Sequence, residues 1–366
     1  MRRSIPSGNS IINLVAISNE KMTNNGTFPT ITTTTTSNEY DNSKQFRQGD
    51  SSSSQARSPS EIISSIYNDF TLSLARDAIL SMICFLFGVY GPKRFILPAM
   101  GGLTIRPIPY QMTAAGDVLL DLNLSNDLVP KTDVTFPSEK LWFISLWLPI
   151  SIIFFLGLIF PLNVQLSNGL QNSPLHNVHA GMCTILVAIG IAELFTQVFK
   201  FYVGRLRPNF YAMCGFDKET LECTNGEKME MEARMSFPSG HTSLSFCGLV
   251  CVVLFLLGRG SRISKSTVRG KLLTIVSFMP LLLSFYCATS RLVDNWHHPS
   301  DIIAGAIMGT VSACISYHIW FPQLGSIYAG IPLSVISGVE DVSTNKHGSD
   351  YHGVEQSPGI PVYSSA

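Results

Sequence analysis

Charged residues are scarce in this sequence. They make up 14% of the 366 residues, while hydrophobic residues make up 46%. An average soluble domain has roughly 25% charged residues, so this apolar excess needs more burial than one water-soluble core provides. Lysine plus arginine number 25, as do aspartate plus glutamate. The balanced charge therefore gives no indication of a nucleic-acid partner.

The cysteines do not form a disulfide framework, because only eight occur in a chain of this length. Most lie inside apolar runs, where a cysteine behaves as a small hydrophobic residue. Cys214 and Cys223 instead flank a polar loop, and they could pair if that loop faces an oxidising compartment.

Long apolar runs are what the sequence has in abundance. Six of them have the character of membrane helices, which need roughly 17–25 mostly apolar residues. Because the bilayer core contains no water, we expect these runs to be helical. The six runs are Asp77 to Tyr90, Leu141 to Leu162, Ala180 to Lys200, Ser243 to Leu257, Leu272 to Ala288 and Asp301 to Trp320. The sequence thus predicts an all-α integral membrane protein with a bundle of six transmembrane helices in residues 76–322.

The two ends of the chain have a different composition. Residues 1–75 include "TITTTTTS" and "SSSSQARSPS", and such segments cannot bury enough apolar surface to fold. Residues 323–366 are similar. We therefore expect disordered N- and C-terminal tails, and the first residues favour a plain tail over a signal or transit peptide.

Three polar clusters interrupt the apolar runs. "KFYVGRLRP" ends the third predicted helix, "PSGH" opens the fourth, and "SRLVDNWHHPSD" joins the fifth to the sixth. Helices that cross a membrane in succession alternate in direction. The end of the third and fifth helices and the start of the fourth and sixth therefore lie on one side, so all three clusters are expected on one surface.

The first cluster contains Lys200 and Arg207, which are seven residues apart. Seven residues are close to two helical turns, so both side chains point the same way if the helix continues to Pro208. Arg205 falls off that line, and we expect it to meet lipid headgroups. An alternative is that Lys200 and Arg207 only reach the membrane interface.

The second cluster has the features of a helix N-terminus that binds an anion. Ser239 is a good N-cap, and free N–H groups at a helix start attract negative charge. Gly240 allows a ligand to approach the backbone, and His241 can donate a proton near neutral pH. A plain helix cap with an incidental histidine is the alternative.

The third cluster combines a histidine with a carboxylate. Asp301 lies four residues after His297, so it could hold the imidazole in one orientation, as carboxylates do for catalytic histidines. Arg291 offers a planar fork that matches phosphate oxygens, whereas His298 is expected to point elsewhere. An interfacial loop with a salt bridge is the alternative interpretation.

Taken together, these groups favour phosphoryl transfer without a metal. The cations and N–H groups suit a tetrahedral dianion. One histidine can attack the phosphorus, and the other can protonate the leaving oxygen. Because the clusters contain no group of carboxylates that suits a metal ion, no metal and no cofactor is expected.

The three clusters resemble the signature of the type 2 phosphatidic acid phosphatase superfamily. The matching residues are Lys200-x6-Arg207-Pro208, Pro238-Ser239-Gly240-His241 and Ser290-Arg291-x5-His297-x3-Asp301. Over about residues 76 to 320 the chain is most similar to the eukaryotic lipid phosphate phosphatases. The resemblance implies His297 as nucleophile, Asp301 as its orienting carboxylate and His241 as general acid. It implies phosphate binding by Lys200, Arg207, Ser239, Gly240 and Arg291.

The expected substrate is a lipid phosphate from the membrane, such as phosphatidate, lysophosphatidate, a sphingoid-base phosphate or diacylglycerol pyrophosphate. A polyprenyl pyrophosphate, a soluble sugar phosphate or head-group transfer would suit the same site, and a non-catalytic scaffold or transporter is a further alternative. The sequence indicates no oligomeric state.

The sidedness of the site follows from one basic loop. Residues 258–271 carry five cations, which by the positive-inside tendency belong in the cytosol. The site would then face the lumen of the endoplasmic reticulum or the exterior of the plasma membrane, in line with the family. Asn123 opens a glycosylation sequon on the same predicted face.

Overall fold

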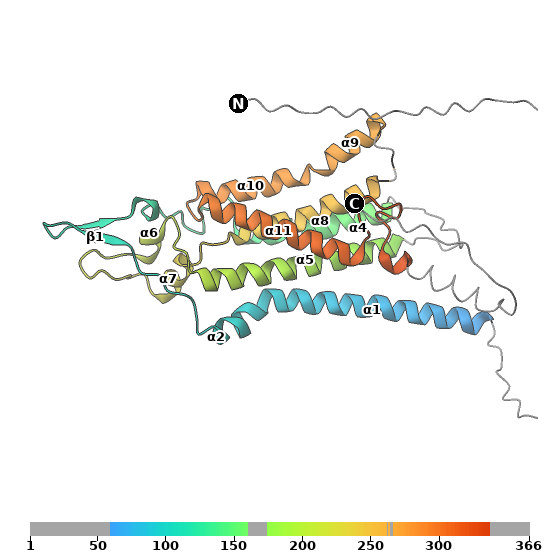
Figure 1. Cartoon of the computed structure of the whole chain (residues 1–366), viewed down its shortest axis with the longest axis horizontal. Helices are drawn as coiled ribbons and strands as arrows, with labels where there is room; N and C mark the ends of the chain where they lie inside the picture. The colour runs from blue at the N-terminus through green and yellow to red at the C-terminus, as the bar shows by residue number, and fades with distance from the viewer. Residues whose placement is uncertain (1–58, 160–173, 262, 264–265, 337–366) are drawn as a thin grey trace, which may run out of the picture. The chain divides into compact units, whose positions relative to one another are not determined.

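The computed structural model describes residues 59–159, 174–261, 263 and 266–336, and the chain folds there mainly as helices (Figure 1). Within these residues, six helical segments are long and apolar enough to cross a membrane. They are Thr71–Ala99, Ser138–Ile159, Pro174–Val203, Gly240–Gly260, Val268–Val293 and Pro299–Trp320. The predicted all-α, multi-pass membrane fold is confirmed, and most of the helices run beyond the ends that the apolar runs suggested.

Several of these segments consist of more than one regular element. The helical elements are α1 (Pro59–Gly91), η1 (Pro92–Ile96), α2 (Leu97–Ala99), η2 (Leu122–Leu124), α3 (Ser138–Trp142), η3 (Phe143–Trp147), α4 (Leu148–Ile159), α5 (Pro174–Val203), α6 (Phe210–Cys214), α7 (Glu227–Ala233), α8 (Gly240–Gly260), α9 (Val268–Ser277), α10 (Pro280–Val293) and α11 (Pro299–Trp320). The strands β1 (Tyr110–Met112) and β2 (Val118–Leu120) pair antiparallel.

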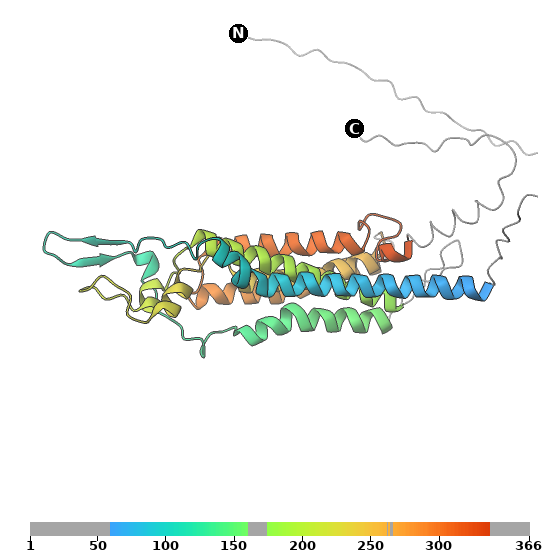
Figure 2. The ribbon, with the colours of Figure 1, turned by 90° about the horizontal axis from the view of Figure 1, so that it is seen from below.

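Helix α8 is the most deeply buried of the six membrane-crossing segments. It packs against α5, α10 and α11, while α1 packs on the outer side of α5 (Figures 1 and 2). Gly305 and Gly309 lie where α11 meets the backbone of α8, and Gly88 and Gly190 meet where α1 crosses α5. Small residues allow such close approach between membrane helices, and the "PSGH" cluster lies at the start of this central helix.

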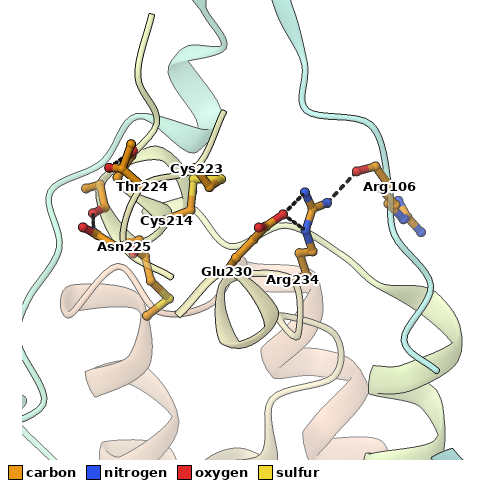
Figure 3. The surroundings of a disulfide bond; sticks show 10 residues. Arg106, Cys214, Cys223, Thr224, Asn225, Glu230 and Arg234 are labelled. Atoms are coloured by element: carbon orange, nitrogen blue, oxygen red, sulfur yellow. Dashed lines mark hydrogen bonds and ion pairs between the residues drawn. A yellow bond between two sulfur atoms is a disulfide. The ribbon is translucent and has the colours of Figure 1, made fainter. Parts of the chain in front are cut away.

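A polar cap covers one end of the bundle. The cap consists of β1, β2, α6, α7 and the loops around them (Figure 1). It has its own apolar core, in which Phe210, Met213 and Trp296 are buried. Cys214 and Cys223 form a disulfide there, as their place in a polar loop suggested (Figure 3). This cap adjoins the ends of α5, α8, α10 and α11, where the three polar clusters lie.

The predicted boundaries of the tails need correction at both ends. Helix α1 begins at Pro59, inside the segment 1–75 that was expected to be disordered. Beyond α11, Ile331 and Val335 are buried and Gly330 lies against Gly258 of α8, although the tail was expected to begin at residue 323. The remaining tail residues, 1–58 and 337–366, lie outside the described residues.

Candidate active site

The three polar clusters meet at a cavity of about 230 Å³ beneath the cap. Six of the residues that line it come from these clusters: Lys200, Arg207, His241, Arg291, Trp296 and His297. The remaining lining residues are Lys131, Val134, Phe136, Pro137, Ser138, Glu139 and Glu232. The expectation that the clusters share one surface is therefore met by the fold.

The first cluster reaches the cavity in a different way from that expected. Helix α5 ends at Val203, and Gly204 follows with a φ of 56°, a left-handed conformation that glycine adopts without strain. Arg207 thus lies on the loop after α5, not on its last turn. It still lines the same cavity as Lys200, because the loop turns back toward the ends of α8 and α10.

Arg207 is buried and held from several directions. Its Nε donates to the carbonyl oxygen of Glu232 at 2.8 Å, and its Nη2 lies 2.6 Å from Oε1 of the same residue. Its Nη1 donates to the carbonyl oxygen of Trp296 at 3.2 Å, and the guanidinium carbon lies 4.8 Å from the centre of the Trp296 ring. The arginine is thus fixed before any ligand arrives.

The second cluster forms the start of α8, as predicted. Ser239 is the N-cap, and its Oγ accepts from the Thr242 amide at 3.4 Å. A Cβ built on Gly240 would lie 3.5 Å from Nζ of Lys200, so the lysine lies against the helix start. Within the described residues, Nε2 of His241 is buried without a hydrogen-bond partner, which suits a group that meets a ligand in the cavity.

In the third cluster, His297 is oriented by a backbone carbonyl. Its Nδ1 lies 2.7 Å from the oxygen of Ser236. Because a carbonyl oxygen only accepts, Nδ1 carries the proton and Nε2 has the lone pair. Burial lowers the pKa of His297 to about 3. The ring is therefore neutral near pH 7, the state in which an imidazole nitrogen can act as a nucleophile.

Asp301 is placed differently from the expectation that it would hold His297 directly. Its Oδ2 lies 3.7 Å from Nδ1 of His297, too far for a good hydrogen bond. Oδ2 instead accepts from Ser236 Oγ at 2.6 Å and from the His298 amide at 2.9 Å. As the third residue of α11, Asp301 caps that helix, and it reaches His297 through Ser236.

Two neighbours of Asp301 were also expected elsewhere. Arg205 does not extend toward lipid, since its Nη1 lies 2.6 Å from Oδ1 of Asp301 and 2.6 Å from Oγ of Ser300. His298 is the N-cap of α11, and its Nδ1 lies 3.3 Å from Oδ2 of Asp301. The aspartate therefore joins the loop after α5 to the start of α11.

Arg291 is oriented by a residue inside the spacer of the third motif. Its Nη2 donates to Oδ2 of Asp294 at 2.8 Å. The same carboxylate accepts from the amide of Thr135 at 3.0 Å and from its hydroxyl at 2.8 Å. Asp294 thus connects Arg291 to the loop that forms the other wall of the cavity.

Sequence reasoning missed the contribution of the cap to the cavity. Glu232 and Lys131 line it, yet neither belongs to any of the three motifs. The only signal for them was the polar character of those loops. Their position depends on the cap fold, which no pattern in the sequence specified.

This fold and this cavity define a class of protein: a multi-pass helical membrane protein with a cationic, histidine-containing pocket at one end of its bundle. Residues 181–324 match the model of the PAP2 superfamily. All eight predicted site residues lie inside that range. The resemblance stated from the motifs is confirmed, because residues 181–324 match the model of this superfamily.

The relatives of the chain carry related names. It is 33% identical to "Lipid phosphate phosphatase 1" of Arabidopsis thaliana over 46% of this chain and 53% of that protein. It is 31% identical to "Probable lipid phosphate phosphatase 4" of the same plant, over 52% and 62%. It is 33% identical to "Probable diacylglycerol pyrophosphate phosphatase 1" of Schizosaccharomyces pombe, over 44% and 61%. The chain spans less than two thirds of each of these three proteins. No solved structure matches the chain.

Proposed function

We propose that this protein is a phosphatase that hydrolyses lipid phosphate monoesters, or diacylglycerol pyrophosphate, through a phosphohistidine. The observation that carries the proposal is the placement of His297. A neutral imidazole, with Nδ1 bonded to a carbonyl, lines one small cavity together with Lys200, Arg207 and Arg291. A nucleophile surrounded by fixed cations suits attack on a phosphate dianion.

The first step would transfer the phosphoryl group to the enzyme. Nε2 of His297 forms a bond to phosphorus as the bond between phosphorus and the ester oxygen breaks. The cations and the N–H groups at the start of α8 stabilise the charge on the equatorial oxygens. His241, whose Nε2 lies in the same cavity, would protonate the departing alkoxide.

The second step would return the enzyme to its first state. His241, now neutral, takes a proton from water as the water oxygen attacks phosphorus, and the bond to Nε2 of His297 breaks. Inorganic phosphate then leaves. Both steps use only side chains and water, so we expect no need for a metal ion or another cofactor.

The substrate class is supported by where the cavity lies and by the relatives. The cavity opens at the ends of apolar helices, where a phosphate can reach the cations while acyl chains stay in lipid. Proteins similar to this chain are named lipid phosphate phosphatase and diacylglycerol pyrophosphate phosphatase. We place the activity in the endoplasmic reticulum or plasma membrane, with the site on the luminal or outer side.

The test is an assay of purified protein in mixed micelles that contain EDTA. The panel comprises phosphatidate, lysophosphatidate, a sphingoid-base phosphate, diacylglycerol pyrophosphate, a polyprenyl pyrophosphate and glucose 6-phosphate. Release of phosphate from the first four is expected. Preference for either of the last two would replace the lipid assignment, and no turnover of any would favour a scaffold. Activity that EDTA abolishes and magnesium restores would contradict the metal-independent mechanism.

A further inference from the structure

A carboxylate lies inside the cationic cavity. Glu232, the sixth residue of α7, lines the cavity with Lys200, Arg207 and Arg291. Its side chain is 31% exposed, and its Oε1 lies 2.6 Å from Nη2 of Arg207, which is itself buried. A negative charge at this distance opposes the binding of a phosphate dianion by the same arginine.

The orientation of Arg207 does not depend on that carboxylate. The backbone oxygen of Glu232 accepts from Nε, the carbonyl oxygen of Trp296 accepts from Nη1, and the Trp296 ring covers one face of the guanidinium. These three contacts would remain if the side chain of Glu232 lost its charge. The negative charge of Glu232 is therefore not required to orient Arg207.

Glu232 stays ionised in this setting. Burial raises the pKa of its carboxyl, but the nearby charges of Arg207 and Lys200 outweigh burial and hold the pKa below its usual value. Near pH 7 the cavity thus contains a fixed negative charge beside its most buried arginine.

We propose that Glu232 weakens the hold of the cavity on phosphate, so that the product is released after each turnover. This inference rests on the proposed phosphatase function. Four cations line the cavity, because Lys131 lies there as well. Several cations in a site of low dielectric bind a phosphate dianion strongly, and tight binding of the product slows turnover. A carboxylate bonded to one of the cations reduces its attraction for every anion without removing its hydrogen-bond donors.

The same helix offers a matched control. Glu230 lies two residues earlier in α7 and pairs with Arg234. The distance from Nη2 of Arg234 to Oε1 of Glu230 is 2.7 Å (Figure 3). Both pairs join a buried arginine to a partly exposed glutamate. Neither Glu230 nor Arg234 is among the described residues that line the cavity. The substitutions Glu232→Gln and Glu230→Gln thus remove equal charges inside and outside the cavity.

The experiment measures equilibrium binding of orthovanadate and of inorganic phosphate to the purified full-length protein by calorimetry, so it does not need turnover. Glu232→Gln keeps an amide oxygen that can accept from Arg207. It should tighten binding of both anions roughly tenfold, as expected for removing one opposing charge at short range. Glu230→Gln should bind both anions as the unmodified protein does.

Three other results are informative. Weaker binding by Glu232→Gln would mean that the carboxylate serves to hold Arg207, and would overturn the inference. Unchanged binding would overturn it too. If the unmodified protein bound neither anion, the proposed phosphatase site itself would be wrong, which is a separate failure. A thermal melt of each variant shows that the fold is retained.

Discussion

The nucleophile assignment depends on one hydrogen bond, from Nδ1 of His297 to the oxygen of Ser236. That bond fixes the tautomer, because the carbonyl can only accept. It also ties the third motif to the segment just before "PSGH", and Ser236 Oγ in turn donates to Asp301. The aspartate can therefore influence His297 through Ser236, although the two side chains are 3.7 Å apart.

Replacing His297 should abolish the phosphoenzyme. His297→Ala removes the only atom that the mechanism bonds to phosphorus, so turnover should fall by roughly 10³-fold or more. Acid quench after mixing with a ³²P-labelled lipid phosphate should trap label on the unmodified protein and none on the variant. His318→Ala, on the exposed face of α11 away from the motifs, is the control and should retain the label. A labelled His297→Ala protein would assign the nucleophile elsewhere.

The pH dependence should lack a contribution from His297 near neutrality. Burial lowers its pKa to about 3, so the ring gains a proton only as the pH falls toward that value. The neutral nucleophile is thus present at all higher pH. Because kcat/KM reports ionisations of free enzyme and free substrate, any acid limb near pH 6 should follow the second ionisation of the substrate phosphate. Substrates with different phosphate pKa values should shift that limb, and an unshifted limb would contradict the assignment.

Replacing His241 should reduce turnover most for substrates whose alcohol is a poor leaving group. A lipid alkoxide needs a proton as it departs, and general acid catalysis is typically worth roughly 10²–10⁴-fold. His241→Ala should therefore lose at least about a hundredfold in kcat/KM on lysophosphatidate. Nitrophenyl phosphate, with a good leaving group, should lose far less. Equal losses on the two substrates would remove His241 from the general-acid role.

At the scale of elements, the loop at residues 127–137 is attached to the connection between α10 and α11. Asp294 accepts two hydrogen bonds from Thr135, Asn295 Nδ2 donates to the oxygen of Asp127 at 3.3 Å, and Trp296 Nε1 donates to the oxygen of Val129 at 3.3 Å. These three residues lie in the spacer between Arg291 and His297. The spacer therefore positions a wall of the cavity.

Loosening that attachment should raise KM for the substrate. Asp294→Ala removes the hydrogen-bond partner of both Thr135 and Arg291. Thr135→Val removes only the hydrogen bond from the Thr135 hydroxyl to Asp294. Each loss of kcat/KM is converted to a change in activation free energy. If the two residues act together, the change in the double variant should be smaller than the sum of the two single changes, by a coupling of about 1 kcal/mol. Additive losses would show that Asp294 acts on Arg291 alone.

Some elements follow from the sequence and others do not. Ser239 and Pro299 mark the starts of α8 and α11 as local capping rules predict. The end of α5 at Val203 was missed, because the helix was extended to Pro208 when Gly204 already ends it. Arg205 was misplaced for the same reason, since its contact with Asp301 exists only once the chain leaves the helix.

At the scale of the whole molecule, alternation of the helices was enough to bring the motifs together. Lys200, His241 and His297 line one cavity although they are far apart in the sequence. The same argument could not find Glu232, which pairs with Arg207 across 25 positions of the chain. Such pairs depend on how the cap folds over the bundle, and the cap has no repeating pattern from which to predict it.

The last prediction concerns the side of the membrane on which the cavity lies. The cap lies at the start of α8, whereas the end of α8 and the start of α9 lie at the other end of the bundle (Figure 1). Both of these helix ends belong to the stretch with five cations. The positive-inside tendency puts those cations in the cytosol and the cap outside. The Cys214–Cys223 disulfide is in keeping with an oxidising compartment there.

Labelling of introduced cysteines distinguishes the two orientations. Lys218 in the cap and Arg269 at the start of α9 are both exposed, so Lys218→Cys and Arg269→Cys place a thiol at each end. A membrane-impermeant maleimide should reach the first in sealed, right-side-out vesicles and the second only after permeabilisation. The same vesicles should hydrolyse added lysophosphatidate without detergent. The reverse labelling pattern would invert the orientation, yet the catalytic assignment would stand, because helix alternation groups the motifs on one side whichever side that is.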